Sequence, residues 1–260
     1  MSFLTKLREE KQALIASGAW RAAAAQRALR SQPHSHAFNW AHFSVIAEIK
    51  RASPSKGAIA DHPVGEWARG LVEGGAAMLS VLTERAHFGG SLETLEQVSE
   101  ATSARAVPLL RKDFLLDAFE LDEAVAHGAS AVLLIAAFAG EALPNLFWHA
   151  RTRGLSVLVE VHDERELDAA FKCDAFTGDS AMLGINQRNL ESLVVDPRFA
   201  EALAPKLPTG TRFVVESGIR SADDLRWAKG LGAAGVLVGE ALAKTENPGA
   251  TLKQWLAACT

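Results

Sequence analysis

Short apolar runs alternate with amphipathic stretches along most of the chain. Eight runs rich in aliphatic and β-branched residues recur at intervals of 23 to 33 residues, and they begin at Val45, Met78, Val107, Ala131, Ser156, Ala181, Arg212 and Gly235. Runs such as 132–135 are apolar at every position, which is typical of parallel strands that helices cover. The pattern therefore predicts eight buried strands.

Stretches with the 3.6-residue period of a helix lie between these runs. The clearest are residues 91–104, 118–127, 163–171 and 221–231. Gly128 directly follows one of them, and Ser221 is suited to begin another as its N-cap. The chain is therefore expected to form a succession of βα units.

Eight consecutive βα units without linkers predict an α/β fold, a closed (β/α)8 or TIM barrel. A doubly wound open sheet is the alternative, but it usually has fewer strands and a glycine fingerprint after the first one. No GxGxxG follows Val45, and no Walker A sequence occurs. We expect a single domain over 1–260, with the barrel at 45–260 behind a helical extension at 1–44.

The extension is rich in alanine and charged residues, and 5–17 and 19–30 are expected to be helical. The sequence leaves open whether it caps the bottom of the barrel or lies across its mouth.

Composition excludes several classes of protein. The 260 residues carry 27 Lys+Arg and 31 Asp+Glu, a net charge of −4, which argues against a broad basic face for nucleic acid. Hydrophobic residues make up 48%, as in a globular protein. The longest apolar run, 131–140, is half the roughly 20 residues that span a bilayer, and 1–10 do not resemble a signal peptide. We expect a cytoplasmic protein with neither membrane nor nucleic-acid partner.

Cysteine and histidine spacing does not predict a metal site. Cys173 and Cys259 lack partners at zinc-ligand spacing and are expected to be reduced thiols. His34 and His36 flank a single serine and could at most chelate weakly. His162 is expected to be a capping or polar rim residue rather than a catalyst. No serine lies in a GxSxG elbow, so a hydrolase triad is not predicted.

Polar side chains gather at the carboxyl ends of the predicted strands, where barrels of this type carry their chemistry. They are Glu48, Lys50, Lys112, Glu160, Asn186, Arg188, Glu216, Ser217 and Glu240. Because strand side chains alternate between faces, Glu48 and Lys50 are expected to point into the barrel mouth. Ordinary salt bridges at the rim are the alternative, but acids and bases from several strands at one end favour an acid–base site.

Glycines at the ends of the last two strands predict a phosphate site. Gly218 and Gly239 stand where each strand turns toward a helix, and backbone N–H groups at such turns can cradle a phosphate. The alternative is that they only permit tight turns. Ser53, in the loop after the first strand, adds a hydroxyl donor.

Six segments then carry a resemblance to a known family. In order they are VIAEIKRASPS (45–55), TE with HFGGS (83–84 and 87–91), LRKDF (110–114), LVEVH (158–162), GINQRNL (184–190) and ESGI (216–219). Together they resemble the indole-3-glycerol phosphate synthase family of tryptophan biosynthesis. The resemblance covers residues 45 to about 243, whereas 1–44 align with nothing in it. The segment 172–180 and Gln187 depart from the family pattern.

This resemblance implies a reaction. The family converts 1-(o-carboxyphenylamino)-1-deoxyribulose 5-phosphate to indole-3-glycerol phosphate, carbon dioxide and water, with neither a metal nor an organic cofactor. It implies Lys112 as the general acid for ring closure, Lys50 as the group that holds the substrate carboxylate, and Glu160 as the base or proton shuttle of dehydration. A lysine with this task is expected to have a lowered pKa, through burial and nearby cations.

The resemblance assigns the remaining site residues to supporting tasks. Glu48 would position Lys50, while Asn186 and Ser217 would fix substrate hydroxyls. The expected substrate-binding residues are Ser53, Gly218 and Gly239 for the phosphate, Phe88, Phe114 and Leu133 for the aromatic ring, and Arg188, Glu216 and Glu240 at the rim. The substrate is a phosphorylated small molecule; association with other tryptophan-pathway enzymes stays open.

Two alternatives remain. An isomerase of phosphoribosyl anthranilate would share the phosphate loops, but it would need a Cys/Asp acid–base pair where this chain has Glu48, Lys50 and Glu160. A barrel kept only as an interaction module would be expected to have lost one of Lys50, Lys112 or Glu160, and all three are present.

Overall fold

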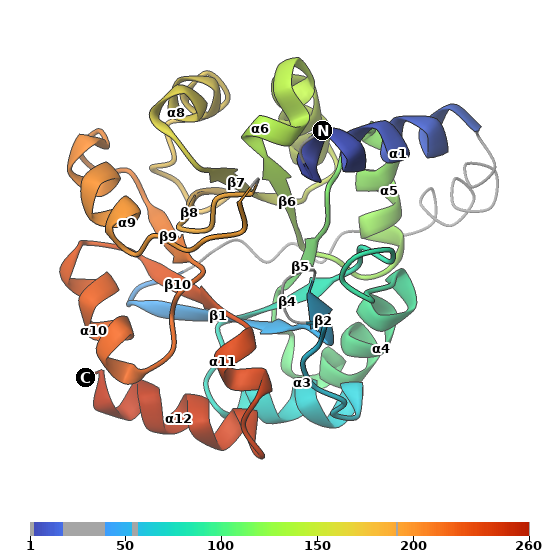
Figure 1. The fold of residues 1–260 in the computed structure, drawn as a ribbon. Coiled ribbons are helices and arrows are strands. Elements are labelled where there is room, and N and C mark those ends of the chain that lie inside the picture. The colour runs from blue at the N-terminus through green and yellow to red at the C-terminus, as the bar shows by residue number, and fades with distance from the viewer. Residues whose placement is uncertain (1–2, 18–39, 54–56, 191, 260) are drawn as a thin grey trace.

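The computed structural model describes residues 3–17, 40–53, 57–190 and 192–259. Its centre is a closed barrel of parallel strands in the order β1-β10-β9-β8-β7-β6-β5-β4 (Figure 1). The strands are β1 (Ser44–Ile49), β4 (Met78–Leu82), β5 (Leu109–Lys112), β6 (Ala131–Ile135), β7 (Ser156–Val161), β8 (Ala181–Asn186), β9 (Phe213–Glu216) and β10 (Gly235–Val238). Each begins within two residues of its predicted start. The TIM barrel prediction is therefore confirmed.

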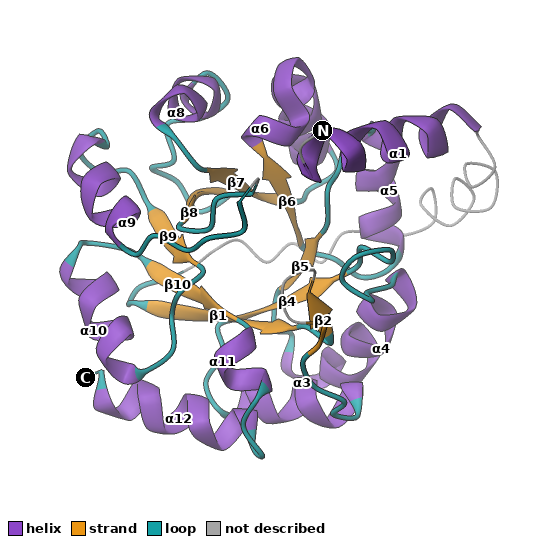
Figure 2. Ribbon diagram, viewed as in Figure 1, coloured by secondary structure: helices purple, strands orange, loops and turns teal. Residues whose placement is uncertain are grey.

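Helices cover the outside of the barrel (Figure 2). They are α3 (Val64–Glu73), α4 (Leu92–Thr102), α5 (Ala118–Ala126), α6 (Ala136–Ala139), α7 (Leu143–Thr152), α8 (Glu164–Phe171), α9 (Arg198–Leu203), α10 (Ala222–Gly230), α11 (Glu240–Ala243) and α12 (Pro248–Ala258). The four predicted helices are α4, α5, α8 and α10. Ser221 is the N-cap of α10, and its hydroxyl accepts a hydrogen bond from the backbone N–H of Asp224 at 3.3 Å.

Strand alternation divides the core into two shells. Val45, Ala47 and Ile49 face the helices and belong to the outer shell, whereas Ile46 packs inside the barrel with residues such as Met78. The inner shell fills the lower barrel with apolar side chains. On the same inward faces, the charged side chains lie above this apolar shell, at the carboxyl ends of the strands.

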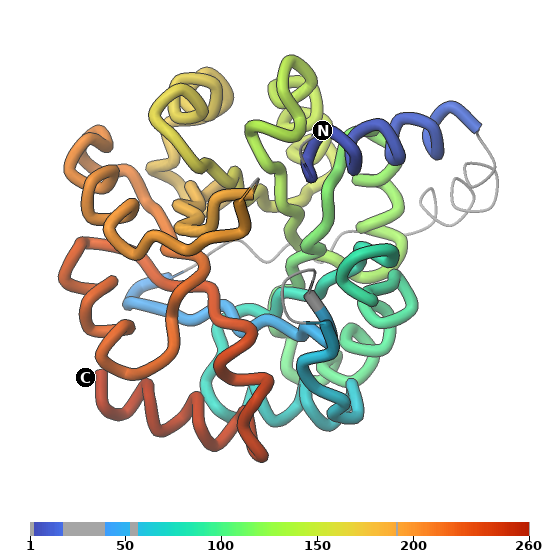
Figure 3. The backbone as a smooth tube through the Cα atoms, viewed as in Figure 1, coloured from blue at the N-terminus to red at the C-terminus, as the bar shows by residue number. Residues whose placement is uncertain are grey.

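The N-terminal helix α1 (Phe3–Ser17) lies over the mouth of the barrel, on the side of β5 and β6 (Figure 3). Its Leu7 is buried in the inner shell, and its Phe3 ring lies 6.3 Å from the ring of Phe114. The sequence left open whether the extension lies at the bottom or at the mouth of the barrel, and this helix lies at the mouth. The predicted helix at 19–30, the pair His34 and His36, and residues 54–56 lie outside the described residues. The division at residues 44 and 45 stays a prediction.

A two-residue antiparallel ladder, β2 (Ala52–Ser53) with β3 (Gly57–Ala58), follows β1 and was not predicted. Strands this short carry no readable periodicity. Among the described residues, no helix is long and apolar enough to cross a membrane.

Candidate active site

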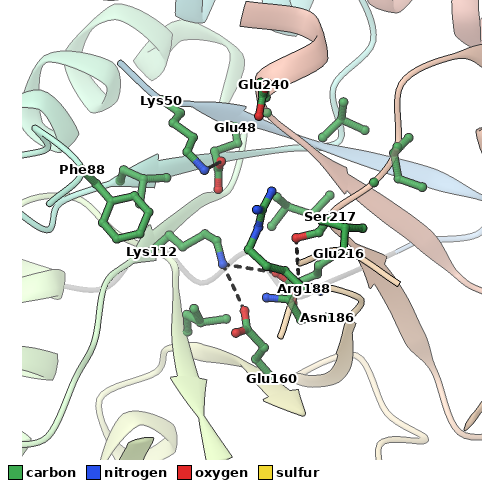
Figure 4. A pocket seen from close by; sticks show the side chains of 18 of the residues that line it. Glu48, Lys50, Phe88, Lys112, Glu160, Asn186, Arg188, Glu216, Ser217 and Glu240 are labelled. Atoms are coloured by element: carbon green, nitrogen blue, oxygen red, sulfur yellow. Dashed lines mark hydrogen bonds and ion pairs between the residues drawn. The ribbon is translucent and has the colours of Figure 1, made fainter. Parts of the chain in front are cut away.

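A cleft of about 720 Å³ opens at the carboxyl ends of the strands (Figure 4). The predicted site residues that line it are Glu48, Lys50, Phe88, Lys112, Phe114, Leu133, Glu160, Asn186, Arg188, Glu216, Ser217, Gly218, Gly239 and Glu240. The structure thus brings together side chains and turns from all eight barrel strands or the loops that follow them. The side chain of Ser53 lies outside the described part of the structure, so its phosphate contact stays a prediction.

Lys112, at the end of β5, lies between two buried carboxylates. Its Nζ atom is 3.1 Å from Oε2 of Glu160 and 3.2 Å from Oε2 of Glu216 (Figure 4). Both carboxylate side chains are 1% exposed, and the lysine side chain is 16% exposed. Two acids from β7 and β9 therefore share one cation from across the barrel.

The pKa of Lys112 is raised above its ordinary value of 10.5. Burial favours the neutral amine, but the charges of Glu160, Glu216 and Glu48 outweigh it. The expected lowering of the pKa is therefore wrong. The neighbours that the lysine meets in the folded barrel are carboxylates rather than cations, and it stays charged.

Glu160 and Glu216 differ in protonation although both touch Lys112. Burial opposes ionisation of Glu160, but Lys112 and His162 outweigh burial, and the pKa of Glu160 is lowered. Burial and the nearby charge of Glu160 raise the pKa of Glu216 to about 8, against the attraction of Lys112. The directions of the two pKa shifts favour ionised Glu160 and protonated Glu216 near neutral pH.

Glu48 and Lys50 point into the cleft, as the alternation of β1 predicts. Lys50 Nζ is 3.6 Å from Oε1 of Glu48 and 5.4 Å from the ring centroid of Phe88, which places the cation over an aromatic face. A Cβ at Gly239 would overlap the Glu48 carboxylate. The glycine predicted for the phosphate site thus also makes room for an acid.

Asn186 and Ser217 are joined by a hydrogen bond in which Ser217 Oγ donates to Asn186 Oδ1 at 2.8 Å. Ser217 and Gly218 have φ values of 65° and 80°, a left-handed turn that is unfavourable for serine. Gln187 Nε2 donates to the carbonyl of Ser217 at 2.8 Å and so supports this turn. The departure at position 187 therefore has a structural function beside the cleft.

Arg188 extends into the cleft from the segment after β8. Its guanidinium Nη1 donates to the carbonyl of Leu193 at 2.9 Å, and its backbone N–H donates to Asn186 Oδ1 at 3.0 Å. These contacts hold a cation at the rim beside the turn of Ser217 and Gly218.

One wall of the cleft is apolar and aromatic. The rings of Phe88 and Phe114 lie 6.0 Å apart, and Leu133 closes the wall from β6. Phe138 lies behind them, its ring 5.2 Å from that of Phe114. This wall offers a planar ligand an apolar surface beside the ammonium group of Lys50.

Two cations at the other side of the cleft were missed by sequence reasoning. Arg220, after β9, and Lys244, after α11, both line the cleft. Lys244 Nζ is 2.5 Å from Oε1 of Glu240. The spacing of four residues between Glu240 and Lys244 was the available signal, because it pairs side chains on one helix face.

His162 lies beside the cleft, between two carboxylates. Its ring is 10% exposed, with Nε2 3.1 Å from Oε1 of Glu160 and Nδ1 3.2 Å from Oε2 of Glu166. Burial favours the neutral ring, but the two carboxylates raise the pKa of His162 to about 10. Strand alternation was the signal here, since residues 160 and 162 share a face.

Among the described residues, no group of three or more His, Cys, Asp and Glu side chains is arranged to hold a metal ion. The thiols of Cys173 and Cys259 are buried and unpaired by any disulfide. The polar side chains that line the cleft are those of lysine, arginine, glutamate, aspartate, asparagine and serine.

Comparison with known proteins gives a consistent set of relatives. A family model described as indole-3-glycerol phosphate synthase matches residues 4–255. The match begins well before residue 45, so the expectation that 1–44 align with nothing in the family is wrong; short motifs did not reveal that similarity.

Curated proteins of the same description are similar over most of their length. The protein from Mycobacteroides abscessus is 44% identical over 207 residues, 79% of this chain and 73% of its own. That from Rhodococcus jostii is 45% identical over 206 residues, with 78% and 74% covered. That from Exiguobacterium sibiricum is 46% identical over 209 residues, with 79% and 77% covered.

Solved structures share the fold at low sequence identity. The 3-hexulose-6-phosphate synthase from Salmonella typhimurium superposes with a TM-score of 0.65 at 14% identity, over 84% of this chain and 98% of that one. The thiamine phosphate pyrophosphorylase from Pyrococcus furiosus gives a TM-score of 0.60 at 17% identity, over 84% and 95%. These likenesses concern the barrel alone.

Proposed function

We propose a mechanism for the cleft from the premise that the chain belongs to the indole-3-glycerol phosphate synthase family. It is accordingly a carboxy-lyase of tryptophan biosynthesis that acts on a phosphorylated sugar derivative. The substrate we propose is 1-(o-carboxyphenylamino)-1-deoxyribulose 5-phosphate. The products are indole-3-glycerol phosphate, carbon dioxide and water.

The observation that supports this most is the position of Lys112. Its ammonium group lies in the middle of the cleft, with the aromatic wall on one side and the glycine turn of Gly218 on the other. A substrate with an aromatic ring at one end and a phosphate at the other would place its carbonyl near this cation. Fixing both ends would bring the ring carbon into attack geometry, which can contribute several kcal/mol.

Ring closure places negative charge on the carbonyl oxygen, and Lys112 is the group proposed to stabilise and then protonate this oxygen. A charged ammonium stabilises the developing alkoxide before any proton moves. Because an alkoxide is a stronger base than an amine, transfer of the lysine proton stays favourable even though carboxylates raise the pKa of Lys112. The raised pKa is thus compatible with the general-acid role.

Decarboxylation follows at the ring carbon that has formed the new bond. The substrate carboxylate is proposed to lie against Lys50 and the face of Phe88, where apolar surroundings solvate the charge weakly. Loss of carbon dioxide leaves its bonding electrons in the ring system. Glu48, 3.6 Å from Lys50, orients that cation.

Dehydration needs an acceptor for the last proton and a donor for the departing hydroxyl. Glu160 is proposed as the acceptor, because it is the ionised carboxylate beside Lys112. Lys50, which keeps its proton during ring closure, is proposed to donate the proton with which the hydroxyl leaves as water. Asn186 and Ser217 are proposed to hold the sugar hydroxyls, and Gly218, Gly239 and Arg188 to hold the phosphate end.

The direct test is an assay of the purified chain without added metal. We expect it to convert the carboxyphenylamino-deoxyribulose phosphate to a fluorescent indole product, with release of carbon dioxide. A correctly folded sample that leaves this substrate unchanged would contradict the proposal. Circular dichroism on the same sample establishes that the protein is folded.

A further inference from the structure

Two acids compete for one cation in the cleft. Glu160 and Glu216 contact Lys112 at 3.1 and 3.2 Å, and both are 1% exposed, so neither distance nor burial distinguishes them. Ionising two neighbouring buried carboxylates carries a large cost in electrostatic free energy, so one of them keeps a proton. The proposed dehydration needs that proton to be on Glu216 and not on Glu160.

The difference between the two acids lies on the side away from Lys112. Oε1 of Glu160 is 3.1 Å from Nε2 of His162, an ion-pair distance. Oε1 of Glu216 is buried without a hydrogen-bond partner in the described structure, beside the backbone of Gly184. Among the described residues, Glu160 therefore contacts two cationic side chains, Lys112 and His162, whereas Glu216 contacts Lys112.

We propose that His162 is a positioning residue that keeps Glu160, rather than Glu216, as the ionised carboxylate on Lys112. It acts through Glu160 and touches neither the proposed substrate nor Lys112. This inference rests on the function proposed above, because it identifies what prepares the base of that same site.

The surroundings of His162 hold its ring as a cation. Glu166, on α8, accepts at Oε2 from the backbone N–H of His162 at 2.8 Å and lies 3.2 Å from Nδ1. α6 packs against both α8 and β7, and its sequence AAFA carries no titratable side chain. Within the described part of the chain, the charged groups that face the ring are thus Glu160 from β7 and Glu166 from α8, with Lys112 of β5 behind Glu160. The pKa of His162, raised to about 10 by these carboxylates against burial, agrees with this arrangement.

Replacing His162 by Asn tests the inference through kinetics. The variant removes the charge from the outer oxygen of Glu160, so the pKa of Glu160 should rise and the proton should be shared between the two acids. We expect kcat to fall about tenfold or more, because each unit of pKa changes the ionised fraction up to tenfold. The acidic limb of the kcat–pH profile should move to higher pH, while KM changes less than about threefold, a result typical of a group outside the substrate contacts.

Infrared spectroscopy of protein with 13C-labelled glutamate tests it without substrate. Near neutral pH the band of a buried protonated carboxyl should be present in the wild type and disappear in Glu216→Gln, because Lys112 and His162 keep Glu160 ionised. In the His162→Asn background, part of the band should instead depend on Glu160. A band that still belongs wholly to Glu216 in that background would overturn the inference.

Two further variants separate a local effect from damage to the fold. His149→Asn is the matched control, since His149 also pairs with a carboxylate, Asp122 at 3.1 Å, but on α7 and away from the cleft; its kcat and pH profile should be unchanged. Glu166→Gln should change both in the same direction as His162→Asn, by less. If the wild type is active, and a correctly folded His162→Asn variant retains the wild-type kcat and pH profile, the inference is wrong. If the wild type itself is inactive, the proposed function fails, and the infrared comparison still decides the inference.

Discussion

The carboxylate of Glu216 occupies the space that a side chain at position 184 would need. Gly184 lies on β8 and Glu216 on the neighbouring β9, and the missing Cβ lets the acid lie against the barrel wall. From there its second oxygen reaches Lys112 at 3.2 Å. A glycine inside a strand is thus part of the geometry of the site.

Gly184→Ala should therefore damage both stability and turnover. The added methyl group would push the carboxylate away from Lys112, with a cost of about 1–3 kcal/mol in the free energy of unfolding. We expect kcat to fall about tenfold or more, because a shift of one unit in the pKa of Lys112 or Glu160 changes its protonation equilibrium tenfold. Urea unfolding and steady-state kinetics measure both effects.

Gly178→Ala is the control for this substitution, because no atom lies within 4 Å of a Cβ built there. It should leave stability and kcat unchanged. A Gly184→Ala protein with wild-type kcat would show that the fit between Gly184 and Glu216 does not matter for the reaction.

Lys112→Ala should lower kcat by about 10²-fold or more, the usual effect of losing a general acid. KM should change less, because ring and phosphate contacts stay in place. Lys253→Ala, on the exposed face of α12, should retain full activity. Circular dichroism must show that the Lys112 variant is folded, and unchanged turnover in a folded sample would remove Lys112 from its proposed position in the mechanism.

The proton on Glu216 should make stability depend on pH. Its pKa is about 8 in the folded protein, against an ordinary value of 4.5. The folded state binds this proton more tightly than the unfolded chain, so the stabilisation is complete below pH 4.5 and is lost as the pH rises through about 8.

Glu216→Gln cannot lose that proton. Between about pH 5 and 9, its free energy of unfolding should fall less than that of the wild type, by about 1 kcal/mol or more. Chemical denaturation at several pH values measures the difference. Glu73→Gln, at an exposed ion pair with Arg105, should follow the wild-type curve. Parallel curves for Glu216→Gln and the wild type would mean that Glu216 is ionised at neutral pH.

The barrel could be predicted because each of its strands leaves a local signature. The run 131–135 is buried at every position in β6, as its uninterrupted apolar sequence indicated. Glu48 and Lys50 point into the cleft because alternation along one strand fixes their face. Both inferences use only neighbours in sequence, which is why they succeed.

Features that depend on residues far apart in sequence could not be predicted. The pKa of Lys112 rises because Glu160 and Glu216 converge on it from positions 48 and 104 residues away. The spaces beside Gly184 and Gly239 are filled by carboxylates of neighbouring strands, which no turn rule describes. Strand register brings these groups together, and it is known only once the barrel closes.

Lys11 should be important for holding α1 over the barrel mouth. Its Nζ lies 2.5 Å from Oε1 of Glu120 and 3.6 Å from Oδ1 of Asp113, and its side chain is 15% exposed. Lys11→Ala leaves these buried acids without this cation, and should lower the free energy of unfolding by about 1–3 kcal/mol. Hydrogen exchange should quicken in residues 3–17.

Lys6→Ala serves as its control, since Lys6 is 64% exposed and pairs along the helix with Glu10 at 3.7 Å. Surface pairs of this kind contribute little, so stability and exchange should be unchanged. Equal exchange rates in Lys11→Ala and the wild type would show that Leu7 and Phe3 suffice to dock the helix.

Glu240 places an anion at the end of the cleft proposed for the phosphate. Glu240 follows Gly239 and is paired with Lys244 at 2.5 Å, so a phosphate there would meet a carboxylate as well as a cation. Glu240→Gln removes the repulsion and leaves Lys244 to the ligand. We expect KM for the phosphorylated substrate, and the inhibition constant of inorganic phosphate, to fall about threefold to tenfold with kcat unchanged.

Lys244→Ala should raise both constants, because it removes a cation that would attract the phosphate. Salt should reduce both differences, since these side chains are partly exposed and their charges are screened. Glu246→Gln, an exposed acid two residues beyond Lys244, controls for a general change in net charge and should have little effect. If Glu240→Gln instead raises KM, the carboxylate itself contacts the substrate, and the phosphate must be bound further toward Gly218 and Arg188.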